Sequence, residues 1–282
     1  MKKNSESRTE TRMTTHDGTV MSADGTRIAY ERSGSGPVIV LVAPALADRK
    51  DHRKLGALLA ESHTVINYDR RGRGASTDVG DWEIAREVED IEALVDAHAG
   101  KAALFGASSG AVLALDAAAA LPTKITRVVA YEPPAIVDDR RAPVPRDFSG
   151  HLATLIDQGQ PARVVTAFNK VALGAPSLMV IAMRLMVPVW RSMVAMAPTT
   201  VYDVRLCEGL QDGAPLVTDR WDALTVPSLV LVGGKGEPFM KTGTKALSES
   251  LNAIREEIPG AHHGTPVMKP AALMSALDRF LE

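Results

Sequence analysis

Short runs of apolar residues recur along this 282-residue chain and alternate with stretches of helical periodicity. Each run is too short for a helix, and most contain β-branched residues. The runs are Val38–Val42, His63–Asn67, Ala102–Phe105, Val128–Tyr131 and Leu229–Val232. Because they are apolar on both faces, they are typical of strands buried in a parallel sheet. The alternation therefore predicts an α/β fold, with right-handed crossovers and helices on both faces of the sheet.

Further patterns mark the two ends of this sheet domain. The Asp-Gly pair at 24–25 separates the strand-like runs Thr19–Ser22 and Arg27–Arg32, which predicts a hairpin and an antiparallel start. The clearest helical pattern covers Asp81–His98 and has one apolar and one charged face. The last helix is expected to begin near Pro270.

The alternation breaks between residues 137 and 222, where helical patterns dominate. We therefore expect a helical cap at 137–222, inserted between two parts of the sheet core at 15–136 and 223–282. Residues 1–14 are polar and of mixed charge, and we expect them to form a flexible tail.

The expected cap carries many methionines at helical spacing. These residues, with one tryptophan, are Met179, Met183, Met186, Met193, Met196 and Trp190. Methionine is a flexible apolar filler, so the simplest interpretation is packing between cap and core. The alternative is a lining for an apolar substrate pocket, which we assign to Met179, Met183, Met186 and Trp190 together with Leu46 of the core.

Composition excludes several classes of partner. The formal net charge of −2 provides no broad positive field, so we expect no nucleic-acid binding. The single cysteine, Cys207, cannot form an internal disulfide. The longest apolar stretch, Leu178–Ala197, is interrupted by Arg184, Pro188 and Arg191, so we expect no membrane span or membrane partner. The N-terminus lacks the apolar segment of a secretion signal, which favours a cytoplasmic location.

The strongest chemical motif is Gly106–Gly110, which reads Gly-Ala-Ser-Ser-Gly and fits G-x-S-x-G. It follows a strand-like run and precedes a helix-forming run, as required for a tight turn that exposes a nucleophile. Ser108 is at its centre, and the glycines allow other backbone to approach. The same turn directs the Ser109 N–H, at the start of a helix, toward a developing oxyanion. The alternative is a packing turn of small residues without catalytic function.

Two adjacent histidines, His262 and His263, lie in a polar loop before the last helix. A histidine there is suited to accept the serine proton and return it to a leaving group. Spacing alone does not choose between the two rings.

A carboxylate after the penultimate strand is expected to orient this histidine. Glu237 follows the run Leu229–Gly234 and completes the chain order of serine, acid and histidine. The second candidate is Glu132, which directly follows the strand ending at Tyr131.

These segments resemble the α/β-hydrolase family, in particular its small bacterial serine hydrolases and esterases, over about Met21 to Glu282. In addition to the turn at Gly106–Gly110, which we call the elbow, four segments carry the resemblance. They are Tyr68–Ser76 (Tyr-Asp-Arg-Arg-Gly-Arg-Gly-Ala-Ser), Tyr131–Pro134, Val230–Gly234 and Pro259–Gly264. The resemblance implies a mostly parallel eight-stranded sheet with an inserted cap. It also implies a triad of Ser108, His263 and Glu237, an acyl-enzyme intermediate, and no cofactor or metal.

The chain departs from the family pattern after its first parallel strand. Many members have His-Gly there, and this chain has Ala43-Pro44. By the resemblance, the Ala45 N–H is the second oxyanion donor beside Ser109, and Pro44 alters the loop that carries it.

Two functional hypotheses follow. The first is hydrolysis of a carboxylic ester or thioester with an apolar part, through the triad. The second, motivated by the altered oxyanion loop, is a hydrolase-fold lyase, cyclase or perhydrolase, or a non-hydrolytic protein that binds an apolar small molecule.

Overall fold

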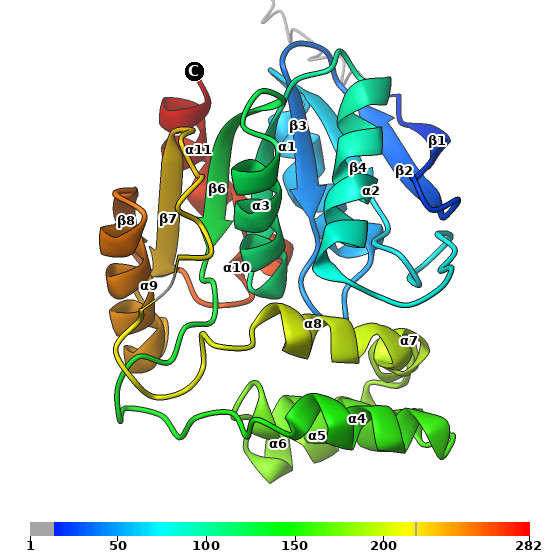
Figure 1. The fold of residues 1–282 in the computed structure, drawn as a ribbon, viewed down its shortest axis with the longest axis vertical. Coiled ribbons are helices and arrows are strands. Elements are labelled where there is room, and N and C mark those ends of the chain that lie inside the picture. Colours follow the sequence, from blue (N-terminus) through cyan, green and yellow to red (C-terminus); the bar gives the residue numbers. More distant parts are fainter. Residues whose placement is uncertain (1–13, 218) are drawn as a thin grey trace, which may run out of the picture.

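The computed structural model describes residues 14–217 and 219–282, and it contains one eight-stranded sheet (Figure 1). The strand order is β1-β2-β4-β3-β5-β6-β7-β8. The strands are β1 (His16–Met21), β2 (Arg27–Ser33), β3 (Val38–Val42), β4 (Thr64–Tyr68), β5 (Ala102–Ala107), β6 (Ile125–Tyr131), β7 (Ser228–Gly233) and β8 (Ile254–Ile258). Strand β2 pairs antiparallel with β1 and β4, and all other pairs are parallel. The predicted fold class is confirmed.

All five apolar runs predicted from the sequence are strands, and the Asp-Gly turn joins β1 to β2. The sequence pattern missed β8, whose residues are Ile-Arg-Glu-Glu-Ile. An edge strand with charged side chains has no continuous apolar run, so its periodicity resembles that of a loop.

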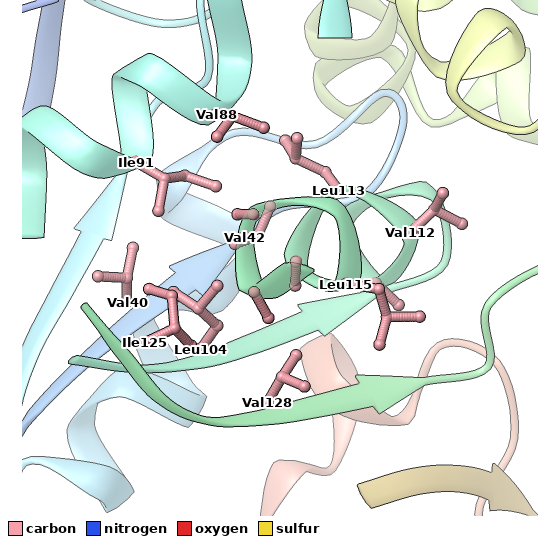
Figure 2. Close-up of a cluster of buried hydrophobic side chains, with 14 of the residues drawn as sticks. Val40, Val42, Val88, Ile91, Leu104, Val112, Leu113, Leu115, Ile125 and Val128 are labelled. Carbon is pink, nitrogen blue, oxygen red and sulfur yellow. The ribbon is translucent and has the colours of Figure 1, made fainter. Parts of the chain in front are cut away.

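Helices of the core cover both faces of the sheet. They are α1 (Arg53–Leu59), α2 (Ile84–Ala97), α3 (Ser109–Ala120), α9 (Pro238–Ser250), α10 (Thr265–Met268) and α11 (Met274–Leu281), with 3-10 helices η1 (Arg49–His52) and η3 (Pro270–Leu273). Buried side chains of α2 and α3 form one core with the sheet (Figure 2), which Leu247 of α9 joins. Those of α1 and α11 form a second core on the opposite face. Successive side chains of each strand point to opposite faces of the sheet, so the strands contribute to two separate apolar layers.

Between β6 and β7 the described residues form helices and loops but no strand; we call residues 137–222 the cap. Its helices are α4 (Phe148–Asp157), α5 (Pro161–Val171), α6 (Ser177–Leu185), α7 (Val187–Met196), η2 (Ala197–Thr199) and α8 (Thr200–Leu206). Figure 1 shows the cap below the lower edge of the sheet, where the elbow and histidine loop also lie. The predicted tail at 1–14 lies almost entirely outside the described residues.

In the described part of the chain, no single helix is both long and apolar enough to cross a membrane. Helix α6 and the segment Val187–Leu206 pass this test together by length and composition, but they are bent by 106° relative to each other.

Candidate active site

Ser108 lies in a tight turn between β5 and α3 and has a strained backbone. Its φ is 53° and its ψ is −125°, a combination that residues with side chains rarely adopt. Glycines make this turn possible. A Cβ on Gly106 would lie 2.2 Å from the Gly110 carbonyl oxygen, and a Cβ on Gly110 would lie 2.4 Å from the Val42 carbonyl oxygen. The G-x-S-x-G pattern therefore has the strand, turn and helix context of a nucleophile elbow.

His263, in the loop between β8 and α10, is bonded to a buried carboxylate. Its Nδ1 lies 2.7 Å from Oε2 of Glu132, a fully buried residue directly after β6. The other carboxylate oxygen, Oε1, accepts a hydrogen bond from the Gly233 N–H at 2.8 Å. Because Nδ1 faces Glu132, Nε2 is the ring nitrogen left to exchange a proton with a nucleophile.

The prediction that Glu237 orients His263 is wrong. Glu237 is exposed at the N-cap of α9 and makes no capping hydrogen bond with its side chain. It lies four residues beyond the end of β7, where the chain has already turned toward solvent. Glu132, the second candidate, directly follows β6 and has a positive φ of 45°, so its carboxylate stays at the strand end.

The structure also distinguishes the two adjacent histidines. His262 stabilises its own loop: its Nδ1 accepts the Gly264 N–H at 3.1 Å, and its carbonyl accepts the Tyr131 hydroxyl at 2.7 Å. Its backbone N–H donates to Thr265 Oγ1 at 2.8 Å. His263 is therefore the ring that meets the carboxylate.

The backbone connects Ser108 to the strand that carries the acid. The Ser108 N–H donates to the Tyr131 carbonyl at 2.9 Å, and Tyr131 precedes Glu132. In the described residues no hydrogen bond joins the Ser108 hydroxyl to His263. Such bonds are commonly long in ligand-free enzymes and shorten once substrate is bound.

On the other side of Ser108, the predicted oxyanion donor Ala45 is already engaged. Its N–H donates to Ser109 Oγ at 2.9 Å, and that hydroxyl donates to Asp203 Oδ1 at 2.8 Å. The expectation of an open Ala45 amide facing the reacting carbonyl is therefore not met in this structure. The physical reason is that Asp203 turns the lone pairs of Ser109 Oγ toward the amide. The Ser109 N–H, at the start of α3, has no acceptor within its helix.

Asp203 of cap helix α8 is the centre of a buried ionic network. Besides Ser109, its Oδ1 accepts Arg70 Nη1 at 2.7 Å and its Oδ2 accepts Arg73 Nη2 at 2.6 Å. Burial opposes ionisation of Asp203, but the positive charges of Arg73 and Arg70 outweigh it, and the pKa of this carboxyl lies below its usual value. Asp203 therefore stays ionised at neutral pH, beside the two charged arginines.

The same arginines hold the loop that carries Ala45. Arg70 Nη1 donates to the Ala43 carbonyl at 3.2 Å. Arg73 Nη1 donates to the carbonyls of Pro44 at 2.7 Å and Ala47 at 3.3 Å. Charge-assisted bonds of this kind fix backbone strongly, so the loop position depends on a carboxylate supplied by the cap.

Ser108 faces a cavity of only about 20 Å³, about enough for one water molecule. Its walls come from the elbow, Pro134 and the cap helices α5 and α8. The lining residues are Ser108, Ser109, Pro134, Phe168, Ala172, Leu173, Asp203, Val204, Cys207 and Gln211. Val204, Cys207 and Gln211 also line a neighbouring hollow of about 230 Å³, so the two hollows adjoin and indicate a path to the surface.

The predicted pocket lining is wrong for this cavity. None of Leu46, Met179, Met183, Met186 and Trp190 is among its described lining residues. Met179 and Met186 are 49% and 58% exposed, whereas Leu46 is buried in a cluster joining cap and core. Helix α6 packs on α5 and α7, and α7 packs on α5 and η2, whereas the described cavity wall on the cap side comes from α5, α8 and the residues that follow these two helices.

In the described residues, no cluster of three or more His, Cys, Asp or Glu side chains is arranged to hold a metal ion. Cys207 lines the cavity as a buried thiol, and burial raises its pKa to about 12. A neutral thiol is a poor nucleophile, so Ser108 is the nucleophile that this site favours.

Comparison with known proteins agrees with this geometry. The profile of the alpha/beta hydrolase family matches residues 39–276. The chain belongs to this family. Among solved structures, an alpha/beta hydrolase from Sphaerobacter thermophilus is 39% identical, with a TM-score of 0.85 over 94% of this chain and 100% of that one.

More distant relatives share the fold. A thermophilic esterase from Thermogutta terrifontis is 21% identical with a TM-score of 0.73, covering 94% of this chain and 98% of that one. The enol-lactonase from Burkholderia xenovorans is 20% identical with a TM-score of 0.72, covering 94% and 99%. The uncharacterized hydrolase YraK of Bacillus subtilis is 33% identical over 125 residues, which are 43% of this chain and 46% of that protein. This match therefore spans less than half of YraK.

Proposed function

We propose that this alpha/beta hydrolase is a serine hydrolase that cleaves a carboxylic ester or thioester with an apolar part through Ser108, His263 and Glu132. The observation that carries the proposal is the hydrogen bond between His263 Nδ1 and buried Glu132, at the same sheet edge as a strained serine. A nucleophile, a base and a group that orients the base are the parts that acyl transfer requires.

In this mechanism the Ser108 hydroxyl attacks the substrate carbonyl carbon while His263 Nε2 takes its proton. Glu132 keeps the imidazole oriented and stabilises the imidazolium. The Ser109 N–H binds the developing oxyanion. His263 then protonates the leaving alcohol or thiol, and a water activated by the same ring releases the acyl group. The reaction as written uses no cofactor.

The Ala45 amide is the second oxyanion donor in this proposal, and it acts only after the substrate oxygen displaces Ser109 Oγ from it. Substrate entry also requires the side chains of α5 and α8 to move, because the cavity holds about 20 Å³. We therefore expect short acyl groups to react faster than long ones.

A fluorophosphonate probe tests the proposal directly, since it labels only an activated serine. We expect stoichiometric labelling of the native protein and none of Ser108→Ala, with Ser109→Ala labelled as a matched control. A panel of p-nitrophenyl esters of graded length then measures the acyl preference. A folded protein that neither reacts with the probe nor hydrolyses any ester contradicts the proposal.

The engaged Ala45 amide favours a second candidate, a hydrolase-fold protein that binds or rearranges an apolar molecule without an acyl-enzyme. Absence of labelling with retained binding of an apolar ligand supports this candidate instead.

A further inference from the structure

Helices α6 and α7 expose seven large apolar side chains within twelve consecutive residues, 178–189, which we call the cap face. Its residues are Leu178, Met179, Ile181, Leu185, Met186, Val187 and Val189, with exposed fractions of 42% to 78%. Val180 is the single buried residue of α6. Scattered exposed apolar residues are ordinary, but a contiguous group marks a docking surface.

The cap face lies in a segment of the chain whose charged residues are all basic. From residue 158 to residue 202 the chain has four basic residues, Arg163, Lys170, Arg184 and Arg191, and no acidic residue. All four are exposed. In the described residues none of the four forms an ion pair with a carboxylate, although the overall formal charge of the protein is −2.

The position of the cap face leaves it open. Helix α6 packs mainly on α5 and α7, and Figure 1 shows it at the end of the cap farthest from the sheet. Trp190, partly buried beside the apolar side chains, stacks under the Arg184 guanidinium at 5.2 Å. An apolar face with tryptophan and arginine at its border is typical of helices that lie in the interface of a bilayer.

We propose that the cap face docks on an anionic lipid surface. The apolar side chains enter the boundary between headgroups and acyl chains, and the arginines meet lipid phosphates. The 106° bend after α6 prevents the pair from crossing as one rod but lets both helices lie along the surface. This proposal replaces the expectation of no membrane partner.

A second copy of the chain fits the cap face less well than lipid does. Two cap faces brought together would bring Arg184 and Arg191 of one copy close to those of the other, and like charges at an interface are unfavourable. Anionic lipid instead neutralises them. Leu173, which lines the Ser108 cavity and is 37% exposed, lies five residues before the cap face along the chain.

Co-sedimentation of the full chain with vesicles tests the proposal. We expect binding to vesicles of equal phosphatidylglycerol and phosphatidylcholine, and at least about tenfold weaker binding to phosphatidylcholine alone. Met186→Glu should lower binding to the anionic vesicles by at least about tenfold. Met21→Glu, on β1, is the matched control, because Met21 and Met186 are 61% and 58% exposed, and it should bind like the native protein.

A charge variant tests the electrostatic part. Arg191→Gln should weaken binding to the anionic vesicles by about fivefold, the equivalent of about 1 kcal/mol, while Arg32→Gln on β2 should leave it unchanged. Docking is independent of hydrolysis, so Ser108→Ala should bind normally. Absence of binding, or equal binding of Met186→Glu and Met21→Glu, overturns the proposal. A dimer that Met186→Glu dissociates, in a protein that ignores vesicles, assigns the face to a second copy instead.

Discussion

On one side of Ser108, His263 and Glu132 belong entirely to the sheet domain, and the acid is bound to the backbone of β7 through Gly233. On the other side, the loop at 43–47 is held by Ser109 and two arginines that all converge on Asp203 of the cap. The proposed base and acid are thus positioned independently of the cap, whereas the loop that carries the proposed oxyanion donor Ala45 is tied to it. Movement of the cap would therefore alter the oxyanion side first and leave the histidine side intact.

Replacing the acid tests the histidine side and should have the largest effect. We expect Glu132→Gln to lower kcat by about 10⁴-fold, because an amide no longer selects the ring tautomer or stabilises the imidazolium. Glu237→Gln is the matched control and should retain native turnover. This side chain is exposed at the N-cap of α9, four residues beyond the end of β7. Ester hydrolysis and a thermal melt measure both variants. Full activity of Glu132→Gln together with loss in Glu237→Gln would restore the assignment made from the sequence.

Removing the cap carboxylate tests the oxyanion side. Asp203→Asn leaves Arg73 without the buried carboxylate that it contacts at 2.6 Å, whereas Arg70 keeps Glu87. Breaking one partner of a buried ion pair costs about 4 kcal/mol, and we expect urea unfolding to show a loss of this size.

The control for that loss is Asp138→Asn in the cap, because the partly exposed Asp138 pairs with the exposed Arg140; it should change stability by less than about 0.5 kcal/mol. The NMR signals of the His263 ring should be the same in Asp203→Asn and in the native protein. Displaced ring signals would show that the two sides are coupled after all.

His52 lies in η1, which follows the loop at 43–47 on the oxyanion side. It should make the stability of the folded protein sensitive to acid. It is fully buried with no hydrogen-bond partner on either ring nitrogen in the described residues, and burial lowers its pKa to about 4. The unfolded chain takes up the proton near pH 6.5, before the folded one does. The contribution of His52 to the free energy of unfolding is therefore fully present above about pH 6.5. It falls by about 3 kcal/mol as the pH drops to about 4, and it does not change further below that pH.

His52→Leu should remove this part of the pH dependence when urea unfolding is compared between pH 8 and pH 4. His16→Leu, at an exposed histidine of β1, should keep the native profile. A His52→Leu protein with an unchanged loss of stability in acid would place the effect on other groups.

The sequence predicted the parts of this molecule that depend on local pattern. The runs around Val38 and Leu229 are apolar on both faces, which is typical of buried parallel strands. The glycines flanking Ser108 are required by a turn that has no room for Cβ atoms at their positions. The choice between Glu132 and Glu237 was not local: it depends on which strand end lies beside the histidine loop. Two prolines after Glu132 fix the end of β6 and were the available signal.

The oxyanion side was less predictable for the same reason. Asp203 lies 94 residues from Ser109 along the chain, and nothing in its neighbouring sequence marks it as buried. The arginines of the Tyr68–Ser76 segment were visible as a family resemblance, but their partners came from another helix. The methionines of α6 were misassigned because helical spacing does not tell which neighbour a face meets.

The smallest expected effect distinguishes two roles for the Ser109 hydroxyl. If it occupies the Ala45 amide that the substrate oxygen later needs, then Ser109→Ala should raise kcat/KM severalfold while lowering stability by about 1 kcal/mol, the net value of one buried hydrogen bond. Such opposite changes are common where a site gives up stability for function. Steady-state hydrolysis of a short p-nitrophenyl ester and urea unfolding measure the two quantities. A fall in kcat/KM with unchanged KM would show instead that the hydroxyl holds the amide in its catalytic direction, and the cap would then contribute to catalysis through Asp203.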